Sequence, residues 1–515
     1  MNGKYSRRKF LVSTSILAAA PGAIYSLDRS SDHHQALKGP AHPVNIGLKR
    51  QLFVGDFLIE GMRKGARLLL HHPKSKEIVM LYDKPWEGSY SGEPCIFKDG
   101  NLYRMFYSGV NYIVKPGKII DDSHPFFSCY AESDDGINWR RPDLGLYEFN
   151  GSTKNNILNN GGIIPFKDDA PDVPLDAKYK AVTGDYRGLY IAKSPDGIRN
   201  WTRMTEKPVI TNGAFDSQNV VFWDGERKEY RAYWRSKTAN HVRGVRTAAS
   251  KDLLTWYDES DLQYVDSPEE ELYTNAVKNY PRAPDYILGF PVRYIERSWA
   301  SPSMYALPEL ANRKMRASAR LRFGTAITES LFMASKDGIL FKRWNEAFLR
   351  PGIERPGTWI YGHQFLAWQM VETKSDLTGA PDELSFYAGE STWTGDSSAL
   401  RRYTLRMDGF VSVNAPMSGG ELITKPLIFE GDTLALNFST SAAGGVKVEI
   451  LDEHKKVIPE YAMDNCPEIF GDSISRQVMW KGNAELSRLA GKQVQLRFIL
   501  KDADLYSFKF SQKRG

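Results

Sequence analysis

The feature of this sequence that most constrains its fold is an internal repeat. A short phrase of serine and aspartate, mostly followed by glycine and then an aromatic residue, recurs along the 515-residue chain. Copies begin at Ser133, Ser194, Ser250 and Ser335, and a reduced copy begins at Met407. Asp-Gly between apolar runs favours a hairpin turn, because glycine accepts the positive φ that such a turn requires. The repeat therefore predicts five hairpins of one kind.

A second hairpin precedes each of these turns. The paired apolar runs are 94–97 with 103–107, 163–166 with 179–182, 220–223 with 230–234, 276–277 with 286–290, and 365–368 with 384–387. Two hairpins per repeat make a four-stranded antiparallel meander. Five such sheets, none able to bury both faces alone, are typical of a five-bladed β-propeller. A pair of β-sandwiches with coincidental turns is the competing interpretation.

The repeat stops near Met417, and the pattern changes to short alternating strands separated by Gly and Asp turns. This pattern predicts a β-sandwich of about 100 residues. Helix signals are scarce, and the best one covers residues 484–489. We therefore predict an all-β protein, a five-bladed β-propeller followed by a C-terminal β-sandwich. The predicted segments are 1–26 (signal peptide), 27–50 (linker), 51–416 (propeller) and 417–515 (sandwich).

The N-terminus has the pattern of an export signal. Arg7 and Arg8 precede Phe10, and a short apolar run then reaches Ala20. Paired arginines before such a run are typical of a twin-arginine-type signal peptide. The competing interpretation is a basic amphipathic helix. No later stretch approaches about 18 apolar residues, so we expect a periplasmic or secreted protein without stable membrane insertion after signal cleavage.

The net charge of +6 does not indicate a nucleic-acid partner. The chain has 68 basic and 62 acidic residues, and Lys4, Arg7, Arg8 and Lys9 lie in the predicted signal, which leaves 6 − 4 = +2 for the mature chain. A nucleic-acid-binding protein usually carries a concentrated basic patch. We therefore expect no nucleic acid among the partners.

The three cysteines predict neither a disulfide framework nor a metal site. Cys95 and Cys129 fall on the first and third predicted strands of one sheet, which are too far apart to bridge, and Cys466 is left over. We interpret all three as buried small hydrophobic residues. No zinc, dinucleotide or nucleophile-elbow motif is present. We predict no cofactor; a structural calcium ion on the propeller axis is compatible with the fold but has no motif.

A propeller followed by a sandwich resembles the five-bladed propeller glycosidases, the invertase, levanase and arabinanase superfamily with family 32 and family 43 architecture. The resemblance covers residues 50–515. The chain also resembles exported bacterial proteins that carry phrases like 216–219 (Asp-Ser-Gln-Asn), 272–275 and 400–403. The resemblance implies glycosidase activity through the fold. The Trp-x-Asn-Asp-Pro-Asn-Gly, Arg-Asp-Pro and Glu-Cys motifs of the invertase-like group are absent, so fructosidase or inulinase activity does not carry over.

Propeller geometry indicates where chemistry would lie. The loops that enter the innermost strands form one funnel-shaped face, and glycoside cleavage needs two carboxyl groups across the scissile bond. Asp216 is our candidate nucleophile or base, with Glu93 as the alternative base. Glu271 is the preferred acid, because neighbouring carboxylates and partial burial would raise its pKa. His363 is a candidate proton donor; a capping role for Asp216 and a core role for His363 compete with these assignments.

Further residues at these loops are candidates for binding substrate. Aromatic rings would stack on sugar rings, amides and carboxylates would bind hydroxyl groups, and an arginine would bind a carboxylate or sulfate. Most aromatic residues of a propeller belong to the blade cores, so each assignment competes with a structural role. The candidates are Trp86, Glu87, Gln218, Asn219, Tyr273, Asn275, Arg282, Trp359 and Tyr361.

The leading functional hypothesis is an exported glycoside hydrolase that cleaves a polysaccharide or oligosaccharide with a carboxylate pair at the channel mouth. One alternative is a carbohydrate-binding propeller without catalysis. Another is a polysaccharide lyase that uses Tyr361, His363 and an arginine. Convergence of two carboxyl groups within about 10 Å separates the hydrolase from the others. The sequence indicates a carbohydrate partner and leaves the sugar, the linkage and the oligomeric state open.

Overall fold

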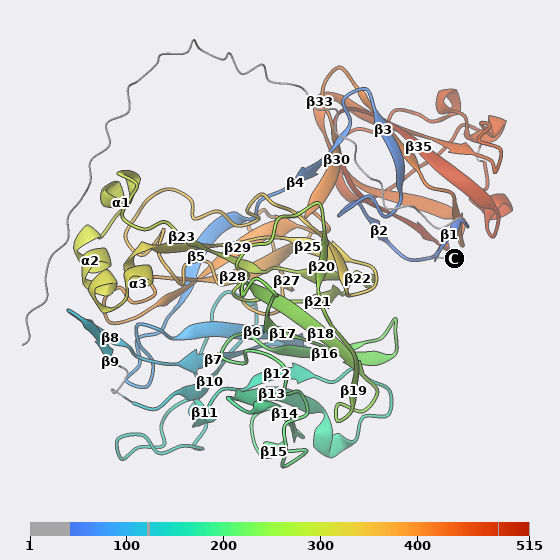
Figure 1. Ribbon diagram of the computed structural model, residues 1–515. Helices are drawn as coiled ribbons and strands as arrows, with labels where there is room; N and C mark the ends of the chain where they lie inside the picture. The colour runs from blue at the N-terminus through green and yellow to red at the C-terminus, as the bar shows by residue number, and fades with distance from the viewer. Residues whose placement is uncertain (1–41, 121–123, 483, 514–515) are drawn as a thin grey trace, which may run out of the picture. The chain divides into compact units, whose positions relative to one another are not determined.

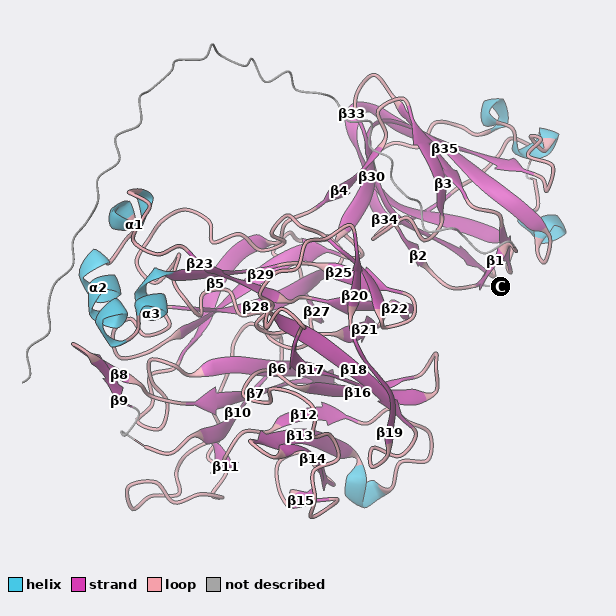
Figure 2. Cartoon of the chain, in the orientation of Figure 1, coloured by secondary structure: helices cyan, strands magenta, loops and turns pink. Residues whose placement is uncertain are grey.

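The computed structural model describes residues 42–120, 124–482 and 484–513 (Figure 1). All of them belong to the second of two compact units, Gly39–Gly515. The predicted signal peptide and residues 27–41 of the predicted linker lie outside the described residues. Strands dominate the described chain (Figure 2). None of the helices in the described ranges is long and apolar enough to cross a membrane.

Five sheets form the blades of the predicted propeller, and their first strands follow the chain outward as an antiparallel meander from the innermost strand. Blade 1 is β6 (Gly92–Asp99), β7 (Leu102–Gly109), β10 (Phe127–Ser133) and β11 (Ile157–Asn160). Blade 2 is β12 (Ile164–Lys167), β13 (Tyr179–Asp185), β14 (Gly188–Ser194) and β15 (Thr202–Arg203), with η1 (Leu175–Ala177) between β12 and β13. Blade 3 is β16 (Val220–Asp224), β17 (Glu229–Lys237), β18 (Arg243–Ser250) and β19 (Trp256–Asp261). Blade 4 is β21 (Lys278–Tyr280), β22 (Ala283–Gly289), β25 (Met333–Ser335) and β26 (Leu340–Arg343), with β20 (Gln263–Val265) added in parallel. The five-bladed propeller is confirmed.

Blade 5 differs from the predicted meander in the origin of its outer strand. It contains β27 (Val371–Thr373), β28 (Glu383–Glu390) and β29 (Ala399–Arg406), and its fourth strand is β5 (Lys74–Leu81) from the N-terminal part of the chain. The chain leaves β29 for a different sheet, so the open edge of blade 5 pairs with a strand from elsewhere. Pairing this edge closes the ring and removes an exposed strand edge.

The repeated Ser-x-Asp turns have one hydrogen-bond pattern. In the blade 4 copy, Gly338 N donates to Ser335 Oγ (2.8 Å) and Ile339 N donates to Asp337 Oδ1 (2.8 Å). The copies at Ser133, Ser194 and Ser250 make the same two bonds. A side-chain oxygen thus replaces the missing backbone partner of each turn.

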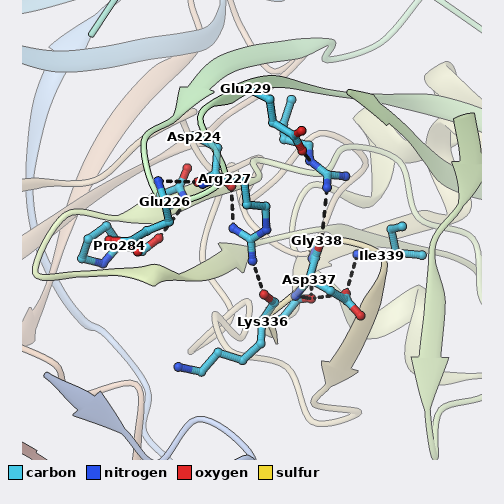
Figure 3. Close-up of polar contacts among 12 residues, drawn as sticks. Asp224, Glu226, Arg227, Glu229, Pro284, Lys336, Asp337, Gly338 and Ile339 are labelled. Atoms are coloured by element: carbon cyan, nitrogen blue, oxygen red, sulfur yellow. Dashed lines mark hydrogen bonds and ion pairs between the residues drawn. The ribbon is translucent and has the colours of Figure 1, made fainter. Parts of the chain in front are cut away.

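The same turns join neighbouring blades. Tyr233 of β17 donates to Gly338 O (3.0 Å), and Tyr387 of β28 donates to Gly136 O (2.6 Å). Figure 3 shows Arg227 of blade 3 reaching the carbonyl of Lys336 in blade 4. The sequence repeat is therefore a repeat of contacts between blades as well as of turns.

The propeller has two ends with different contents. We call the end at which β6, β12 and β16 begin the cavity face, and the opposite end, which carries the Ser-x-Asp turns, the turn face. Because adjacent strands are antiparallel, loops between second and third strands also lie on the cavity face. Two insertions lie there: the hairpin of β8 (Ile113–Lys115) and β9 (Lys118–Ile120), and a blade 4 insertion of β23 (Val292–Glu296), α1 (Ser303–Ala306), α2 (Leu310–Ala319), α3 (Leu321–Thr325) and β24 (Ala326–Ser330).

The helix α2 was not predicted from the sequence. Its buried residues are Arg313 and Arg316, so it lacks the apolar stripe by which an amphipathic helix is recognised. It lies beside the β8–β9 hairpin in Figure 1, and Gly117 N donates to Ser318 Oγ (2.8 Å). The two insertions therefore support each other.

The remaining strands form one ten-stranded sheet with a core of its own around Leu436, Phe498 and Phe508. The strands are β1 (Val44–Gly47), β2 (Gln51–Leu52), β3 (Ile59–Arg63), β4 (Arg67–Leu70), β30 (Val411–Ala415), β31 (Gly420–Thr424), β32 (Leu427–Phe429), β33 (Thr433–Leu451), β34 (Asp472–Gln477) and β35 (Gln493–Ser511), with 3-10 turns at η2 (Pro459–Tyr461), η3 (Met463–Asn465) and η4 (Leu486–Leu489). Strands β1–β4 pair with C-terminal strands, so residues 44–70 belong to this sheet rather than to the predicted linker and propeller. The division of this sheet into two sandwich layers stays a prediction.

The blade 5 turn connects the propeller to the ten-stranded sheet through Asp408, whose side chain is fully buried. Its carboxylate accepts hydrogen bonds from Tyr280 Oη (2.8 Å), Arg282 Nε (2.8 Å), Ser507 Oγ (2.9 Å) and Asn437 Nδ2 (3.1 Å), and pairs with Arg50 (3.1 Å). Burial alone would raise the pKa of Asp408, but Arg282 and Arg50 outweigh it and lower the pKa. This carboxylate is therefore ionised and fully bonded.

The three cysteines are buried and free, as predicted. Cys95 lies on β6 and Cys129 on β10, with β7 between them.

Candidate functional site

A cavity of about 580 Å³ lies at the cavity face, where the innermost strands begin. Every blade contributes to its lining: residues 91–93 before and at the start of β6, 161–164 at β12, 215–217 and Asn219 before β16, Tyr273 before β21, and Gly362 and Phe365 before β27. The convergence of five loops from distant parts of the sequence makes this the candidate active site.

Glu93 enters the cavity from blade 1. The pairing of β6 with β7 shifts register between Gly92 and Cys95, which is a β-bulge. Glu93 lies in this bulge with a φ of +47°, a conformation that side-chain-bearing residues rarely adopt. Its side chain is exposed to the cavity. A strained backbone that re-aims a carboxyl group into a cavity is a feature typical of functional sites.

Asp216 enters the same cavity from the loop before β16, and its side chain is 82% exposed. Arg235 of β17 forms an ion pair with it. The Arg235 side chain is buried, and its guanidinium lies 5.2 Å from the centroid of the Tyr273 ring. Arg235 therefore holds Asp216 from behind while leaving the carboxylate open to the cavity.

The two carboxyl groups have opposite pKa shifts. Desolvation raises the pKa of Glu93, Arg235 opposes this, and the negative charge of Asp216 raises it further. Burial would also raise the pKa of Asp216, but the charge and hydrogen bond of Arg235 more than offset it and lower the pKa. The pKa of Glu93 thus lies above that of Asp216, so Glu93 keeps its proton to higher pH, which is the asymmetry that acid–base catalysis requires.

The other lining residues are mostly aromatic, hydroxyl-bearing or glycine, and the rest are Cys95, Ile163, Ile164, Val182 and Asn219. Glu93 and Asp216 are the only ionisable acids in the described lining, and it includes no lysine, arginine or histidine. Tyr361 lies behind Tyr273 and donates to its hydroxyl (2.8 Å). The aromatic lining residues are Tyr90, Phe106, Tyr107, Tyr112, Phe126, Phe215, Tyr273 and Phe365. This surface suits an uncharged polar ligand with apolar faces.

Four of the candidate residues from the sequence line this cavity: Glu93, Asp216, Asn219 and Tyr273. The Asn219 amide donates to Phe215 O (3.0 Å) and Ser217 O (2.8 Å). Asn219 therefore fixes the shape of the loop that presents Asp216.

Neither Glu271 nor His363 lines the cavity, contrary to the sequence-based hypotheses of an acid and a proton donor. Glu271 accepts hydrogen bonds from the backbone N (3.0 Å) and Nη1 (2.9 Å) of Arg243. His363 is fully buried, and its Nδ1 accepts a hydrogen bond from Trp359 N (3.2 Å). Burial lowers the pKa of His363 to about 3, so it is neutral.

Four candidate binding residues have structural roles instead. Glu87 is buried and accepts hydrogen bonds from Tyr107 Oη (2.5 Å) and Arg141 Nε (2.8 Å). Trp86 donates to Asn156 Oδ1 (2.7 Å). Gln218 and Asn275 link blades 3 and 4. Ala276 N donates to Gln218 Oε1 (2.6 Å), and Asn275 Nδ2 donates to Gln218 O (3.1 Å).

Three further candidates also lie outside the cavity lining. Arg282 binds Asp408 at the turn face, so it is at the wrong end of the propeller to grip a substrate. Trp359 donates to Gly352 O (2.8 Å). Tyr361 is buried behind Tyr273.

Sequence reasoning missed Arg235, which sets the protonation state of Asp216. It lies in the middle of a second strand, where no sequence signal distinguishes it from other strand arginines. For metals, the described residues contain no group of three or more His, Cys, Asp or Glu side chains placed to hold an ion.

No protein-family model and no curated protein matches the sequence. Similar solved structures include a glycoside hydrolase family 43 arabinoxylan arabinofuranohydrolase from Bacillus subtilis (12% identity, TM-score 0.38, covering 86% of this chain and 99% of that chain). Others are the catalytic domain of a GH62 α-L-arabinofuranosidase from Coprinopsis cinerea (10%, 0.38, 66% and 99%) and an N-acetylgalactosamine deacetylase from F. plautii (12%, 0.38, 65% and 94%). At these identities and TM-scores the likeness concerns the propeller fold and carries no argument about activity.

Proposed function

We propose that this protein is an exported glycoside hydrolase that cleaves a glycosidic bond of a neutral glycan at the cavity face. The observation that supports this most strongly is the pair of carboxyl groups in one cavity, Glu93 with a raised pKa and Asp216 with a lowered pKa. Two carboxyl groups, one protonated and one ionised, are the minimal machinery for cleaving a glycosidic bond.

In this mechanism Glu93 is the general acid. It donates its proton to the oxygen of the departing sugar, because its raised pKa makes it the group of the pair that keeps its proton to higher pH. Asp216 is the base or nucleophile on the other side of the bond, and Arg235 keeps it ionised. The aromatic rings around the two groups would hold the sugar by stacking.

The composition of the lining favours this function over the two alternatives. A lyase acting on a uronate needs a cation beside the sugar carboxylate, and the described lining supplies none. A binding protein without catalysis would have no use for a strained glutamate whose pKa is raised beside an aspartate whose pKa is lowered.

The test is to assay the mature protein with a panel of p-nitrophenyl glycosides and of neutral and uronate-containing polysaccharides. We expect new reducing ends without unsaturated-uronate absorbance. Asp216→Asn should lower turnover about a thousandfold while leaving the circular dichroism spectrum unchanged. Glu271→Gln is the matched control and should stay within about twofold of the parent, because Glu271 is bound to Arg243. Full activity in Asp216→Asn, or unsaturated products, would refute the proposal.

We also propose export by the twin-arginine route, supported by Arg7 and Arg8. Cell fractionation tests this. Replacing both arginines by lysine should leave the folded protein in the cytoplasm, and unchanged export would exclude this route.

A further inference from the structure

The cavity is closed by aromatic side chains on the side of blades 5 and 1. Tyr90 stacks on Trp393 with a centroid distance of 5.1 Å, and Tyr112 lies 4.8 Å from Tyr90. Phe323 of α3 meets Trp393 edge-on at 4.8 Å. Behind them, Arg316 of α2 donates to Thr392 O (3.2 Å). The blade 4 insertion and the blade 1 loop thus form a packed wall.

Among the described residues, the blade 2 side of the cavity has no such aromatic wall. There the lining contains Gly161, Gly162 and Gly184, which have no side chains, together with Phe126 and the aliphatic residues Ile163, Ile164 and Val182. Phe126 is 45% exposed, and its ring packs over Gly162, where an added Cβ would lie 3.2 Å from it. An exposed phenylalanine on a glycine floor makes a flat apolar surface that continues out of the cavity.

A second exposed aromatic residue, Tyr186, lies at the cavity face of blade 2. It lies at the tip of the β13–β14 turn, two residues after the cavity-lining Gly184, a distance of at most about 7 Å along the chain. Its side chain is 93% exposed. The turn is fixed by Arg187, whose Nη2 donates to Asp185 Oδ2 (2.6 Å) and whose guanidinium lies 5.7 Å from the rings of Tyr186 and Tyr190. Tyr186 is therefore an exposed aromatic side chain on a turn that Arg187 holds in shape.

We propose that Phe126 and Tyr186 form a glycan-binding subsite, so that the terminal sugar of a neutral polysaccharide enters the cavity and the following sugars leave over blade 2. This inference rests on the proposed function and adds its substrate class. The substrate is a polysaccharide whose chain end lies in the cavity while the rest of the polymer lies across blade 2. The closed aromatic wall stops the chain from continuing through the other side. Exposed aromatic side chains at the mouth of a cavity are expected where they cover the apolar face of a bound ligand.

Each ring would contribute an aromatic contact to the bound sugar. Removing one ring should thus weaken polymer binding about two- to tenfold.

The experiment measures binding and product pattern separately. Binding is measured with the Asp216→Asn protein by affinity electrophoresis in gels that contain arabinan, arabinoxylan, galactan or mannan, and products of the parent are resolved by chromatography. Tyr186→Ala and Phe126→Ala should each weaken binding of the retained polysaccharide about two- to tenfold more than binding of its free monosaccharide. Leu175→Ala is the control, because Leu175 is 88% exposed in the same blade but on the turn face. The parent should release a single small product.

Each outcome bears on one of the two proposals. The subsite is overturned if the Tyr186 and Phe126 variants bind the polysaccharide as tightly as the control does. It is also overturned if the parent releases random internal fragments, or if no polysaccharide retains the protein. If an aryl glycoside is still cleaved in those cases, the proposed hydrolase stands and only the subsite falls. Retention that depends on Tyr186, without cleavage of any substrate by the parent, supports the subsite and overturns the hydrolase.

Discussion

The acidic groups at the two ends of the propeller are satisfied in different ways. At the turn face, Asp408 is bonded by side chains from blade 4, the ten-stranded sheet and the N-terminal segment. At the cavity face, Asp216 has a single cationic partner within salt-bridge distance in the described chain, and Glu93 faces the cavity. A carboxylate with all its partners supplied by the protein stabilises the fold, whereas one left open to a cavity can act on a ligand.

Positive φ values occur at both ends of the propeller. At the turn face they fall on glycines such as Gly338 (82°), but also on Leu253 (69°) and Asp408 (62°). At the cavity face they fall on Gly362 (84°) as well as on Glu93 (47°). What distinguishes Glu93 is that its strained backbone directs a carboxyl group into the cavity.

The largest expected effect separates the two ends by stability. Asp408→Ala leaves Arg282 and Arg50 without their buried partner, so the free energy of unfolding should fall by about 3–5 kcal/mol. Urea denaturation measures this. Asp134→Ala, which removes an exposed partner of Arg140 on the same face, should change it by less than about 0.5 kcal/mol. Equal losses in the two variants would contradict the role of Asp408 as a stabilising centre.

A smaller effect tests the electrostatics of the cavity face. Arg235 lowers the pKa of both Asp216 and Glu93, so Arg235→Met should raise both. Activity that needs ionised Asp216 is lost as the pH falls through its pKa, and activity that needs protonated Glu93 is lost as the pH rises through its pKa. The whole pH–rate profile should therefore move to higher pH. Arg140→Met is the control, and a profile that stays in place would show that Arg235 does not tune the pair.

The smallest effect concerns His363 in the cavity-face loops. Its folded pKa of about 3 lies below its ordinary value, so the unfolded chain binds a proton first as the pH falls. The stability that the neutral His363 side chain contributes is complete above the pKa of this histidine in the unfolded chain. It declines as the pH falls below about 6.5. Between about pH 7 and pH 5.5 the parent should lose about 1 kcal/mol more than His363→Gln. Identical pH dependence in the two proteins would indicate a charged histidine.

The sequence predicted the propeller because each blade repeats local signals, the Ser-x-Asp turn and two apolar hairpins. It did not predict that β5 completes blade 5 or that β1–β4 join the C-terminal sheet, because these pairings join residues more than 300 positions apart. The rule that chemistry lies where inner strands begin led to Glu93 and Asp216. Glu271 and His363 also satisfied that rule, and only their contacts with Arg243 and Trp359 distinguish them.

The most direct test of the central claim, that Glu93 is the acid and Asp216 its ionised partner, is the pH profile of kcat/KM on an aryl glycoside for the parent and Glu93→Gln. An aryl leaving group needs little protonation, so the variant keeps measurable turnover. The parent should show a bell-shaped profile, and Glu93→Gln should lose the decline at high pH while keeping the decline at low pH that reports Asp216. A variant that retains the decline at high pH would contradict the assignment of Glu93.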